Sequence, residues 1–307
     1  MGLVQVGSPV VHMPRPRRFT RRAWQGYLML LPSAVILLTF TIWPMIIALY
    51  HSLCLQDSAH PVPKFVGLAN FGMLFHSHLF WQVMGNTFLF IVATVPVSLV
   101  AAMILAVMLN RRYRLTGFFR VALFHPTVLP LVSAASIWLF MYTPDYGLID
   151  KALSAFGGAQ LNWLGQPRTA IWAIIIMTIW KQLGYFVIFY LAGLQGIGKD
   201  PYEAADVDGA SAWTTFWTIT VPLLMSTTMF VFTIAMVDAF QLVDQLYVMT
   251  QGGPDNGTNM LLFYIYQQSF TYQNTGEASA LSVILIAMLI FVAILQNVVD
   301  KRVHYES

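Results

Sequence analysis

The sequence predicts an all-α integral membrane protein with six transmembrane helices. Three observations predict this class: 58% of the 307 residues are hydrophobic, only 9% are charged, and the mean hydropathy is +0.67. A soluble domain of average composition carries roughly a quarter charged residues, so this chain has too few charges to cover a surface in water. Long apolar runs favour helices, because backbone groups in lipid must be hydrogen-bonded within their own segment. The short alternating segments typical of a membrane barrel are absent from the sequence.

Six stretches are long enough to cross a bilayer, which requires about 20 apolar residues in a helix. They cover residues 27–53, 83–110, 118–142, 171–195, 216–243 and 278–299. Prolines within or near these stretches predict kinks, at Pro32, Pro44, Pro96, Pro126, Pro130 and Pro222. We therefore expect one membrane domain over residues 27–299, preceded by a basic tail over 1–26 and followed by a short tail over 300–307.

The positions of the basic residues predict the orientation, because cytoplasmic segments are enriched in Lys and Arg. Twelve of the sixteen Lys and Arg residues fall on one side of the six-span arrangement, namely Arg15, Arg17, Arg18, Arg21, Arg22, Arg111, Arg112, Arg114, Arg120, Lys199, Lys301 and Arg302. The other side holds only Lys64, Lys151 and Arg168. Both termini and the segment 193–211 are therefore expected in the cytoplasm. The basic start lacks the order of features in a secretory signal, so we expect a retained tail.

The composition also argues against several classes of function. Cys54 is the single cysteine, which excludes an intramolecular disulfide and a cysteine metal cluster. The seven histidines are scattered, and only His125 lies plainly within a span. An intramembrane enzyme would need a nucleophile and base, or metal ligands, at matching depths. We expect no catalytic residue, no metal site and no nucleic-acid partner, and lipid as the surrounding medium.

The stretch "GLQGIGKDPYEAADVDGAS" contains the spacing of a nucleotide-binding loop, with Gly193, Gly198 and Lys199 as G-x-x-x-x-G-K. A working loop of this kind follows a strand, opens a helix and ends in Ser or Thr, whose hydroxyl binds magnesium. Here Asp200 follows the lysine, and its carboxylate would repel phosphate. A predicted membrane helix, not a strand, precedes the motif. The match is therefore interpreted as coincidental.

The second half of this stretch predicts a helix–glycine–helix elbow. Asp200 can cap a helix and Pro201 is favoured in its first turn, so a short helix is expected over 202–208. Gly209 should end it, since glycine tolerates a left-handed backbone, and a second helix is expected over 210–216. Ala204 and Ala205 would allow another chain to approach closely. A simple capped turn between two spans would also explain these features.

The pattern is longer than a turn requires. "EAADVDG", nine residues and then "ITVP" resemble the EAA signature of the permease subunits of ABC importers. Glu203, Ala204, Ala205, Gly209, Ile219 and Pro222 match the signature. Val221 replaces the usual Leu, and Gly198 replaces the usual Pro before the loop lysine. The segments "FTIWPMIIALYHSL", "FVGLANF" and "QLYVMTQGGPDNGTNMLLFYIYQQSF" are similar to the carbohydrate-uptake branch, especially maltose and glycerol-3-phosphate permeases.

The resemblance implies a type I importer permease fold with a cytoplasmic coupling helix in a loop over 196–216. It implies that Glu203, Ala204, Ala205, Asp208 and Gly209 contact a separate ATPase. The family places ATP and Mg²⁺ on two copies of that ATPase, beside a homologous second permease in the bacterial inner membrane. This chain would then bind no cofactor.

The resemblance also places a contact with an extracytoplasmic solute-binding protein at the outer tight turn Gly252, Gly253 and Pro254. Turn chemistry alone would explain these three residues equally well.

Polar groups inside the spans are candidates for the solute path, because intramembrane ionisable residues are costly and usually face a cavity or a partner. Lys181 lies near the middle of the fourth span. Asp238 and Gln241 lie one turn apart in the outer part of the fifth, followed by Asp244, and Asn86 is a weaker candidate in the second. Alternatively, Lys181 and Asp238 neutralise buried partners or reach toward the interface. Their different depths argue against a direct pair.

A self-sufficient secondary transporter or channel is the alternative function. It predicts repeated or inverted hydropathy and intramembrane carboxylates suited to ion coupling, and one Asp within a span is thin support. Neither this alternative nor an intramembrane enzyme accounts for the elbow.

Overall fold

The computed structural model describes residues 21–110, 116–157 and 161–303. The expectations for residues 1–20, for Arg111, Arg112 and Arg114, and for residues 304–307 lie outside this range. The chain forms two compact units, Met1–Ile47 and Ala48–Ser307.

The first unit contains a single apolar rod. Helix α1 (Arg21–Leu37) continues through the π-helical turn η1 (Leu38–Ile42) into α2 (Trp43–Ser52). The side chains described between Tyr27 and Ile47 are exposed, among them Met29 and Phe40, whereas Ser52 at the end of α2 is buried. Residues Tyr27–Ser52 are long and apolar enough to cross a membrane, as the sequence predicts.

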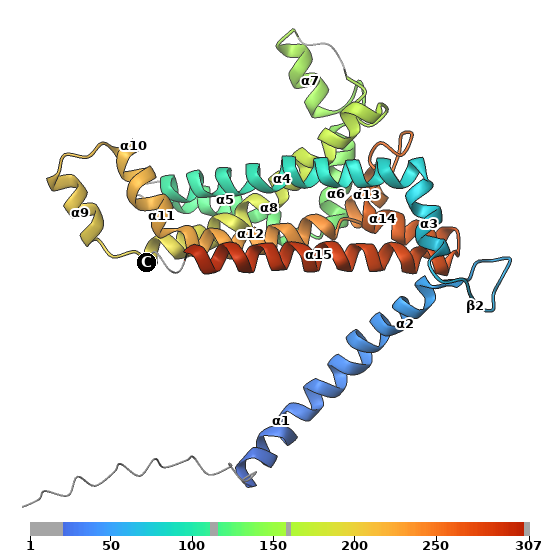
Figure 1. Ribbon diagram of the computed structural model, residues 1–307. Helices are drawn as coiled ribbons and strands as arrows, with labels where there is room; N and C mark the ends of the chain where they lie inside the picture. Colours follow the sequence, from blue (N-terminus) through green and yellow to red (C-terminus); the bar gives the residue numbers. More distant parts are fainter. Residues whose placement is uncertain (1–20, 111–115, 158–160, 304–307) are drawn as a thin grey trace, which may run out of the picture. The chain divides into compact units, whose positions relative to one another are not determined.

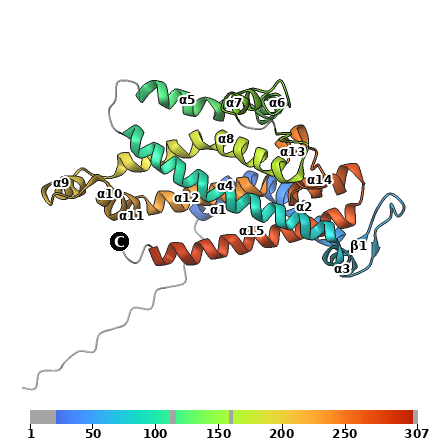
Figure 2. The same ribbon diagram turned by 90° about the horizontal axis from the view of Figure 1, so that it is seen from above.

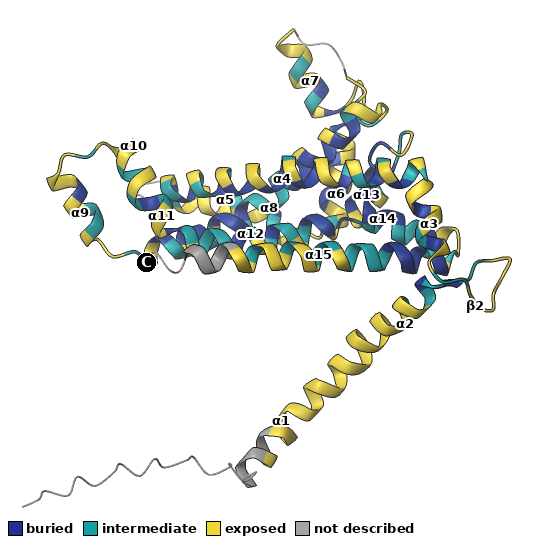
Figure 3. Ribbon diagram, in the orientation of Figure 1, coloured by how far each residue is buried: buried dark blue, intermediate teal, exposed yellow. Residues whose placement is uncertain are grey.

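The second unit is a helical bundle whose long members are α4 (His78–Asn110), α8 (Pro167–Gly196), α12 (Met225–Phe240) and α15 (Thr275–Val303) (Figures 1 and 2). Buried residues follow the facing sides of these helices, and the outward faces are exposed (Figure 3). The buried core includes Ala102 and Ala106 of α4 and Ala173, Met177 and Tyr190 of α8. Small residues allow membrane helices to approach closely, so α4 and α8 pack along much of their length.

The third and fifth predicted spans are bent, which confirms the expected kinks near Pro130 and Pro222, whereas α4 continues as one helix through Pro96. Helix α5 (Thr116–Val128) meets α6 (Leu131–Met141) at 103°. Helix α10 (Ala212–Thr215), η2 (Phe216–Thr220) and α11 (Val221–Leu223) meet α12 at 67°. Pro130 and Pro222 lie at these breaks, and a proline removes a helical N–H donor. The described residues thus contain four helices long and apolar enough to cross a membrane, or up to six spans if each bent pair is one.

Short elements that the sequence analysis did not predict cover the end of the bundle that the Lys and Arg placement predicts to face outward, which we call the outer end. Strands β1 (Cys54–Leu55) and β2 (Lys64–Phe65) pair antiparallel. Helices α3 (Ala69–His76), α7 (Leu148–Ala155), α13 (Asp244–Met249) and α14 (Leu261–Tyr266) and the turn η3 (Gln267–Thr271) complete this end. Buried Asn70 donates from Nδ2 to the carbonyls of Ser52 (2.8 Å) and Cys54 (2.9 Å). This side chain therefore holds the hairpin against α3.

Helix α15 starts with a reciprocal cap. The Glu277 N–H donates to Asn274 Oδ1 (3.1 Å), and Asn274 Nδ2 donates to Glu277 Oε2 (3.0 Å). The hydroxyl of Tyr264 donates to Glu277 Oε1 (2.8 Å). Burial, and then the nearby Glu277 carboxylate, raise the pKa of Tyr264. The cap thus ties α14 to the start of the last span.

Candidate functional site

The elbow, residues 200–216, extends beyond the bundle at the end where α8 finishes (Figure 1). Helix α9 (Asp200–Val207) begins at Asp200, so Asp200 is its first residue and not the cap that the sequence analysis expected. Pro201 follows in the first turn, as predicted. Gly193 of the nucleotide-loop spacing lies inside α8, which confirms that a helix precedes the lysine.

The C-terminal end of α9 depends on Gly209, as predicted. Gly209 has φ +70°, and its N–H donates to the carbonyl of Asp206 (3.2 Å). The next N–H, of Ala210, reaches back to the carbonyl of Ala205 (2.9 Å). Left-handed glycine with this six-to-one hydrogen bond is a Schellman ending. The chain therefore reverses at Gly209.

The second helix of the elbow starts two residues later than expected, at Ala212. The hydroxyl of Ser211 accepts the N–H of Thr214 (3.2 Å), so Ser211 caps α10. The hydroxyls of Tyr202 in α9 and Thr220 in η2 lie 3.4 Å apart, and this contact links α9 to the start of the fifth span.

The outward side of α9 is acidic and ends in an apolar residue. Glu203, Ala204 and Asp208 are exposed, and Val207 is 87% exposed. Ala205 is only 6% exposed. Ala204 is therefore free for close approach by another chain, whereas Ala205 packs inward, contrary to the expectation that both are available.

A half-polar cavity of about 320 Å³ lies behind the elbow. Tyr202 and Asp206 of α9 line it, together with Val107 and Asn110 at the inner end of α4. The elbow is thus separated from the bundle by space on this side.

The outer loop, residues 250–260, contains the predicted tight turn. Gly252 has φ +83°, and Gln251, Asp255 and Asn256 also have positive φ. The hydroxyl of Thr258 donates to the carbonyl of Gly253 (2.8 Å). Gly252 is buried, whereas Gln251, Asp255 and Asn256 are exposed. The glycines and Pro254 therefore shape the loop, and its exposed contact groups are the polar residues beside them.

Three side chains at the outer end of α4 hold the outer loop, and we call Gln82, Asn86 and Thr87 the α4 latch. Asn86 Nδ2 donates to the carbonyls of Asn256 (2.8 Å) and Asn259 (3.0 Å). Gln82 Nε2 donates to the carbonyl of Asp255 (2.8 Å), and Thr87 Oγ1 accepts the N–H of Leu261 (3.0 Å).

The structure thus assigns Asn86, a candidate for the solute path, to the support of the outer loop. Sequence reasoning missed Gln82 and Thr87, although their helical spacing around Asn86 at the end of an apolar run is a usable signal.

Lys181 contacts the broken third span. Its Nζ donates to the carbonyls of Pro126 (2.7 Å) and Thr127 (3.0 Å), in the last turn of α5. A cation at a helix C-terminus satisfies free carbonyls and the helix dipole. Among the described residues it forms no ion pair with Asp238, as its depth predicted. Its observed partners are uncharged main-chain carbonyls, so the structure shows no buried charge that Lys181 neutralises among the described residues.

The candidates of the fifth span do not share one helical face. Helix α12 ends at Phe240, and Gln241 caps it with a main-chain hydrogen bond to the Asp238 carbonyl (3.1 Å). Asp244 opens α13. Asp238 is half-buried, while Gln241 and Asp244 are exposed. The prediction that Asp238 and Gln241 lie one turn apart on one face of a helix is wrong, because the helix ends at Phe240 and residues 241–243 are not helical.

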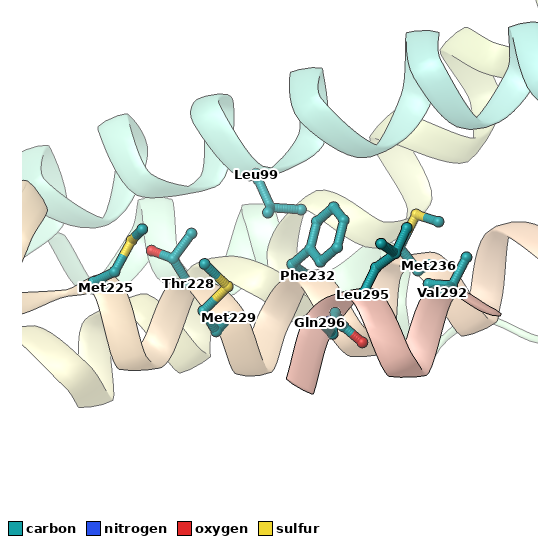
Figure 4. Close-up of a pocket in the computed structure, with 9 residues that line it drawn as sticks. All are labelled: Leu99, Met225, Thr228, Met229, Phe232, Met236, Val292, Leu295 and Gln296. Atoms are coloured by element: carbon teal, nitrogen blue, oxygen red, sulfur yellow. The ribbon is translucent and has the colours of Figure 1, made fainter. Parts of the chain in front are cut away.

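An apolar groove of about 380 Å³ lies between α4, α12 and α15 (Figure 4). Its lining is Leu99, Met225, Thr228, Met229, Phe232, Met236, Val292, Leu295 and Gln296. The two polar groups are already used, since Thr228 donates to the Leu224 carbonyl and Gln296 to Thr233. The groove is therefore unsuited to a polar solute.

Comparison with known protein families shows which family this chain belongs to. Residues 98–305 match the family described as "Binding-protein-dependent transport system inner membrane component". The chain belongs to this family. It is therefore an inner-membrane permease component of an ABC importer, a transport subunit and not an enzyme, as the sequence predicts.

Three relatives align over 88–91% of the permease. The sn-glycerol-3-phosphate transport system permease protein of Agrobacterium fabrum is 34% identical and covers 91% of this chain and 96% of its own. The trehalose/maltose permease protein of Thermococcus litoralis is 34% identical, with 88% and 91% covered. The lactose permease protein of Rhizobium radiobacter is also 34% identical, with 88% and 92% covered.

A solved structure confirms the predicted fold. A chain of a bacterial alginate ABC transporter, crystallised in complex with a periplasmic protein carrying an alginate pentasaccharide, has a TM-score of 0.82 at 23% identity. The match covers 92% of this permease and 96% of that chain.

Proposed function

We propose that the permease and a homologous second permease form the path by which a sugar or glycerol-phosphate-type solute enters the cell. Two copies of a separate ATPase, which hold ATP and Mg²⁺, drive the import. The single observation that carries this proposal is the elbow, an acidic helix that ends at the exposed Val207 and extends beyond the bundle. Val207 on α9 is 87% exposed and Trp213 on α10 is 72% exposed; exposed apolar residues that form a patch mark sites where another molecule binds.

The elbow contacts the ATPase through Glu203, Ala204, Val207 and Asp208, and Gly209 sets its shape. The side chain of Trp213, 72% exposed, extends the apolar part of this surface. Electrostatic complementarity at interfaces then requires a socket on the ATPase with basic groups around an apolar centre.

The outer loop contacts an extracytoplasmic solute-binding protein. Gly252, Gly253 and Pro254 give the loop its shape, and Gln251, Asp255 and Asn256 present the groups that the binding protein meets. The placement of Lys and Arg supports this orientation, with both termini and the elbow in the cytoplasm.

The names of the relatives support the solute class. They transport sn-glycerol-3-phosphate, trehalose or maltose, and lactose, all rich in hydroxyl groups. A thermal-shift screen of the cognate binding protein against glycerophosphodiesters, disaccharides and amino acids tests this class. Stabilisation by amino acids alone would contradict it.

Replacement of Gly209 tests the role of the elbow. Gly209→Val forces a β-branched residue into φ +70°, which costs on the order of 1–2 kcal/mol, so we expect the ATPase to be lost when the complex is purified. Gly209→Asn is the matched control, because asparagine accepts left-handed backbone, and it should retain the ATPase. Equal ATPase retention in both variants, with normal membrane insertion, would contradict the proposal.

A further inference from the structure

A sharp corner separates α3 from α4 at the outer end of the bundle. Helix α3 ends at His76 and α4 begins at His78, and Ser77 between them has an extended backbone (ψ 124°). The N–H of Ser77 donates to the carbonyl of Leu74 (3.0 Å). Because of this corner, α3 turns across the end of the bundle, whereas α4 runs along it (Figures 1 and 2).

One side of α3 is fixed against the bundle. Asn70 and Leu74 are buried, and Leu74 belongs to a core cluster with Phe80 of α4 and Leu281 of α15. The hydrogen bonds of Asn70 to the hairpin carbonyls hold the same side. The rotation of α3 about its axis is therefore fixed, and the apolar residues on its other sides stay exposed.

An exposed apolar surface covers the corner, and we call Leu68, Phe75 and Trp81 the corner patch. Leu68 is 71% exposed, Phe75 is 49% exposed and Trp81 is 58% exposed. The ring centroids of Phe75 and Trp81 lie 6.4 Å apart. Leu68 and Phe75 are two helical turns apart, so they share one face of α3. The patch therefore extends from α3 onto the first turn of α4.

The adjacent exposed face of α3 is small and polar. It carries Ala69, Gly72 and His76, which a helix places together because they are three and four residues apart. The Nδ1 atom of His76 lies 2.7 Å from the Gly72 carbonyl oxygen. Helix α3 thus has one side on the bundle, one apolar side and one small polar side. This division is typical of a helix that lies in the surface of a bilayer.

The indole ring of Trp81 is oriented as in an interfacial tryptophan. Its Nε1 donates to the carbonyl of Phe75 (2.9 Å), in the last turn of α3. The polar group of the side chain is therefore paired, and the exposed part of the ring is apolar. Tryptophan is enriched at the boundary between membrane and water, because its ring fits the level of the headgroups.

The corner patch continues along the second predicted span. Phe88 and Val92 lie two and three turns after Trp81 on the same face of α4, and both are exposed. A neighbouring helix packed along α4 would cover Phe88 and Val92 but not Leu68, which lies beyond the corner. A bilayer covers both parts, because its hydrocarbon core meets the span and its headgroup region meets α3.

We propose that α3 and Trp81 form an interfacial anchor in the outer leaflet of the membrane. Leu68, Phe75 and Trp81 lie at the boundary between the phospholipid headgroups and the acyl chains, and His76 faces water. The anchor fixes how deep the outer end of α4 lies in the bilayer. The inference uses the family assignment and the predicted orientation, and it is independent of the solute and of the ATPase.

Depth-dependent quenching of a fluorescent label tests the anchor in the complete importer, reconstituted in phospholipid vesicles. Cys54 is fully buried, so Phe75→Cys introduces one reactive thiol in this chain. A lipid with a nitroxide near its headgroup should quench the label more than a lipid with a nitroxide near the end of its acyl chain, because an interfacial helix lies only about 5–10 Å into the boundary. Leu68→Cys should show the same order, and it provides the test if Phe75→Cys does not fold.

Phe88→Cys is the matched control on the exposed face of α4. At about 1.5 Å per residue, Phe88 lies roughly 10 Å deeper than Trp81, so the nitroxide near the acyl end should be the stronger quencher there. His76→Cys should instead be quenched by iodide in the water, and it should react with a membrane-impermeant thiol reagent added to intact spheroplasts. No reaction would overturn the placement in the outer leaflet.

Other results would overturn the anchor itself. Equal quenching of the labels at positions 75 and 76 by iodide would place α3 in the water, above the bilayer. A label at position 75 that neither lipid nor iodide quenches in the complete importer would mean that another subunit covers the corner patch. Quenching by lipid that disappears when the binding protein is added would assign the patch to that protein.

Discussion

The ammonium group of a lysine inside a membrane span needs hydrogen-bond acceptors, and main-chain carbonyls accept from that of Lys181. Two of its three N–H donors are used by Pro126 and Thr127, so the residue closes the end of α5 where the third span breaks. The sequence alone shows that Lys181 is an ionisable residue inside an apolar span and therefore needs a polar partner. It could not identify the partners, because the carbonyls become free only where α5 ends, a long-range feature set by the bend.

Lys181→Met should lower the stability of the permease by about 1–3 kcal/mol, because two buried carbonyls lose their donor. Thermal unfolding in detergent measures this loss, and Lys181→Arg should restore most of the stability. In transport assays we expect the KM for the solute to stay unchanged. A raised KM with unchanged stability would contradict this role and return Lys181 to the solute path.

Asp57 closes the outer hairpin between β1 and β2. Its Oδ1 accepts the N–H groups of His60 (2.7 Å) and Ala59 (2.9 Å) and contacts His60 Nδ1 (3.0 Å). The His60 N–H, followed by its ring, holds the pKa of Asp57 below the usual 3.8. Because the pKa is lowered in the folded state, the stabilisation is complete above pH 3.8 and is lost as the pH falls below it.

Amide exchange at Ala59 and His60, corrected for the intrinsic rates, should therefore accelerate as the pH falls below 3.8. In Asp57→Ala the two amides should already exchange rapidly at neutral pH. Protection in that variant equal to the unmodified hairpin would show that the carboxylate does not hold the turn.

At the scale of elements, long apolar runs were predictable and their breaks were not. Pro130 and Pro222 indicate kinks, but bends of 103° and 67° depend on what packs against them. Gly184 of α8 shows this packing, since a Cβ there would fall onto the Leu123 carbonyl of α5. Gly184 and Lys181 are one turn apart, so α8 holds α5 by close contact and by hydrogen bonds.

Gly184→Ala should destabilise the permease by about 1–3 kcal/mol through overpacking. Gly85→Ala in α4 is the matched control, because nothing lies within 4 Å of a Cβ there, and it should be neutral or slightly stabilising. Thermal unfolding of the two variants checks the difference. Equal stability would mean that α5 and α8 are not closely packed at this position.

At the scale of the whole molecule, the fold class, the apolar helices and the Gly209 ending followed from composition, run length and turn chemistry. The outer hairpin, α3, α7 and the α4 latch did not, because they depend on contacts between distant residues such as Asn86 with Asn256 and Asn259. The exposed contact residues of the outer loop were also beyond sequence reasoning. Gly252 is recognisable as a turn former, but only the folded loop reveals that it is buried and that Asp255 is exposed.

A cross-link from Val207 tests the central claim most directly. The single natural cysteine, Cys54, is fully buried, so Val207→Cys introduces one reactive thiol for a photoactivatable cross-linker. In the assembled importer we predict a product of permease and ATPase, and none with the ATPase from the outer control Phe156→Cys, which is 92% exposed in the unmodified chain. Labelling of Val207→Cys by lipid or solvent reagents alone, with no ATPase attached, would contradict the account.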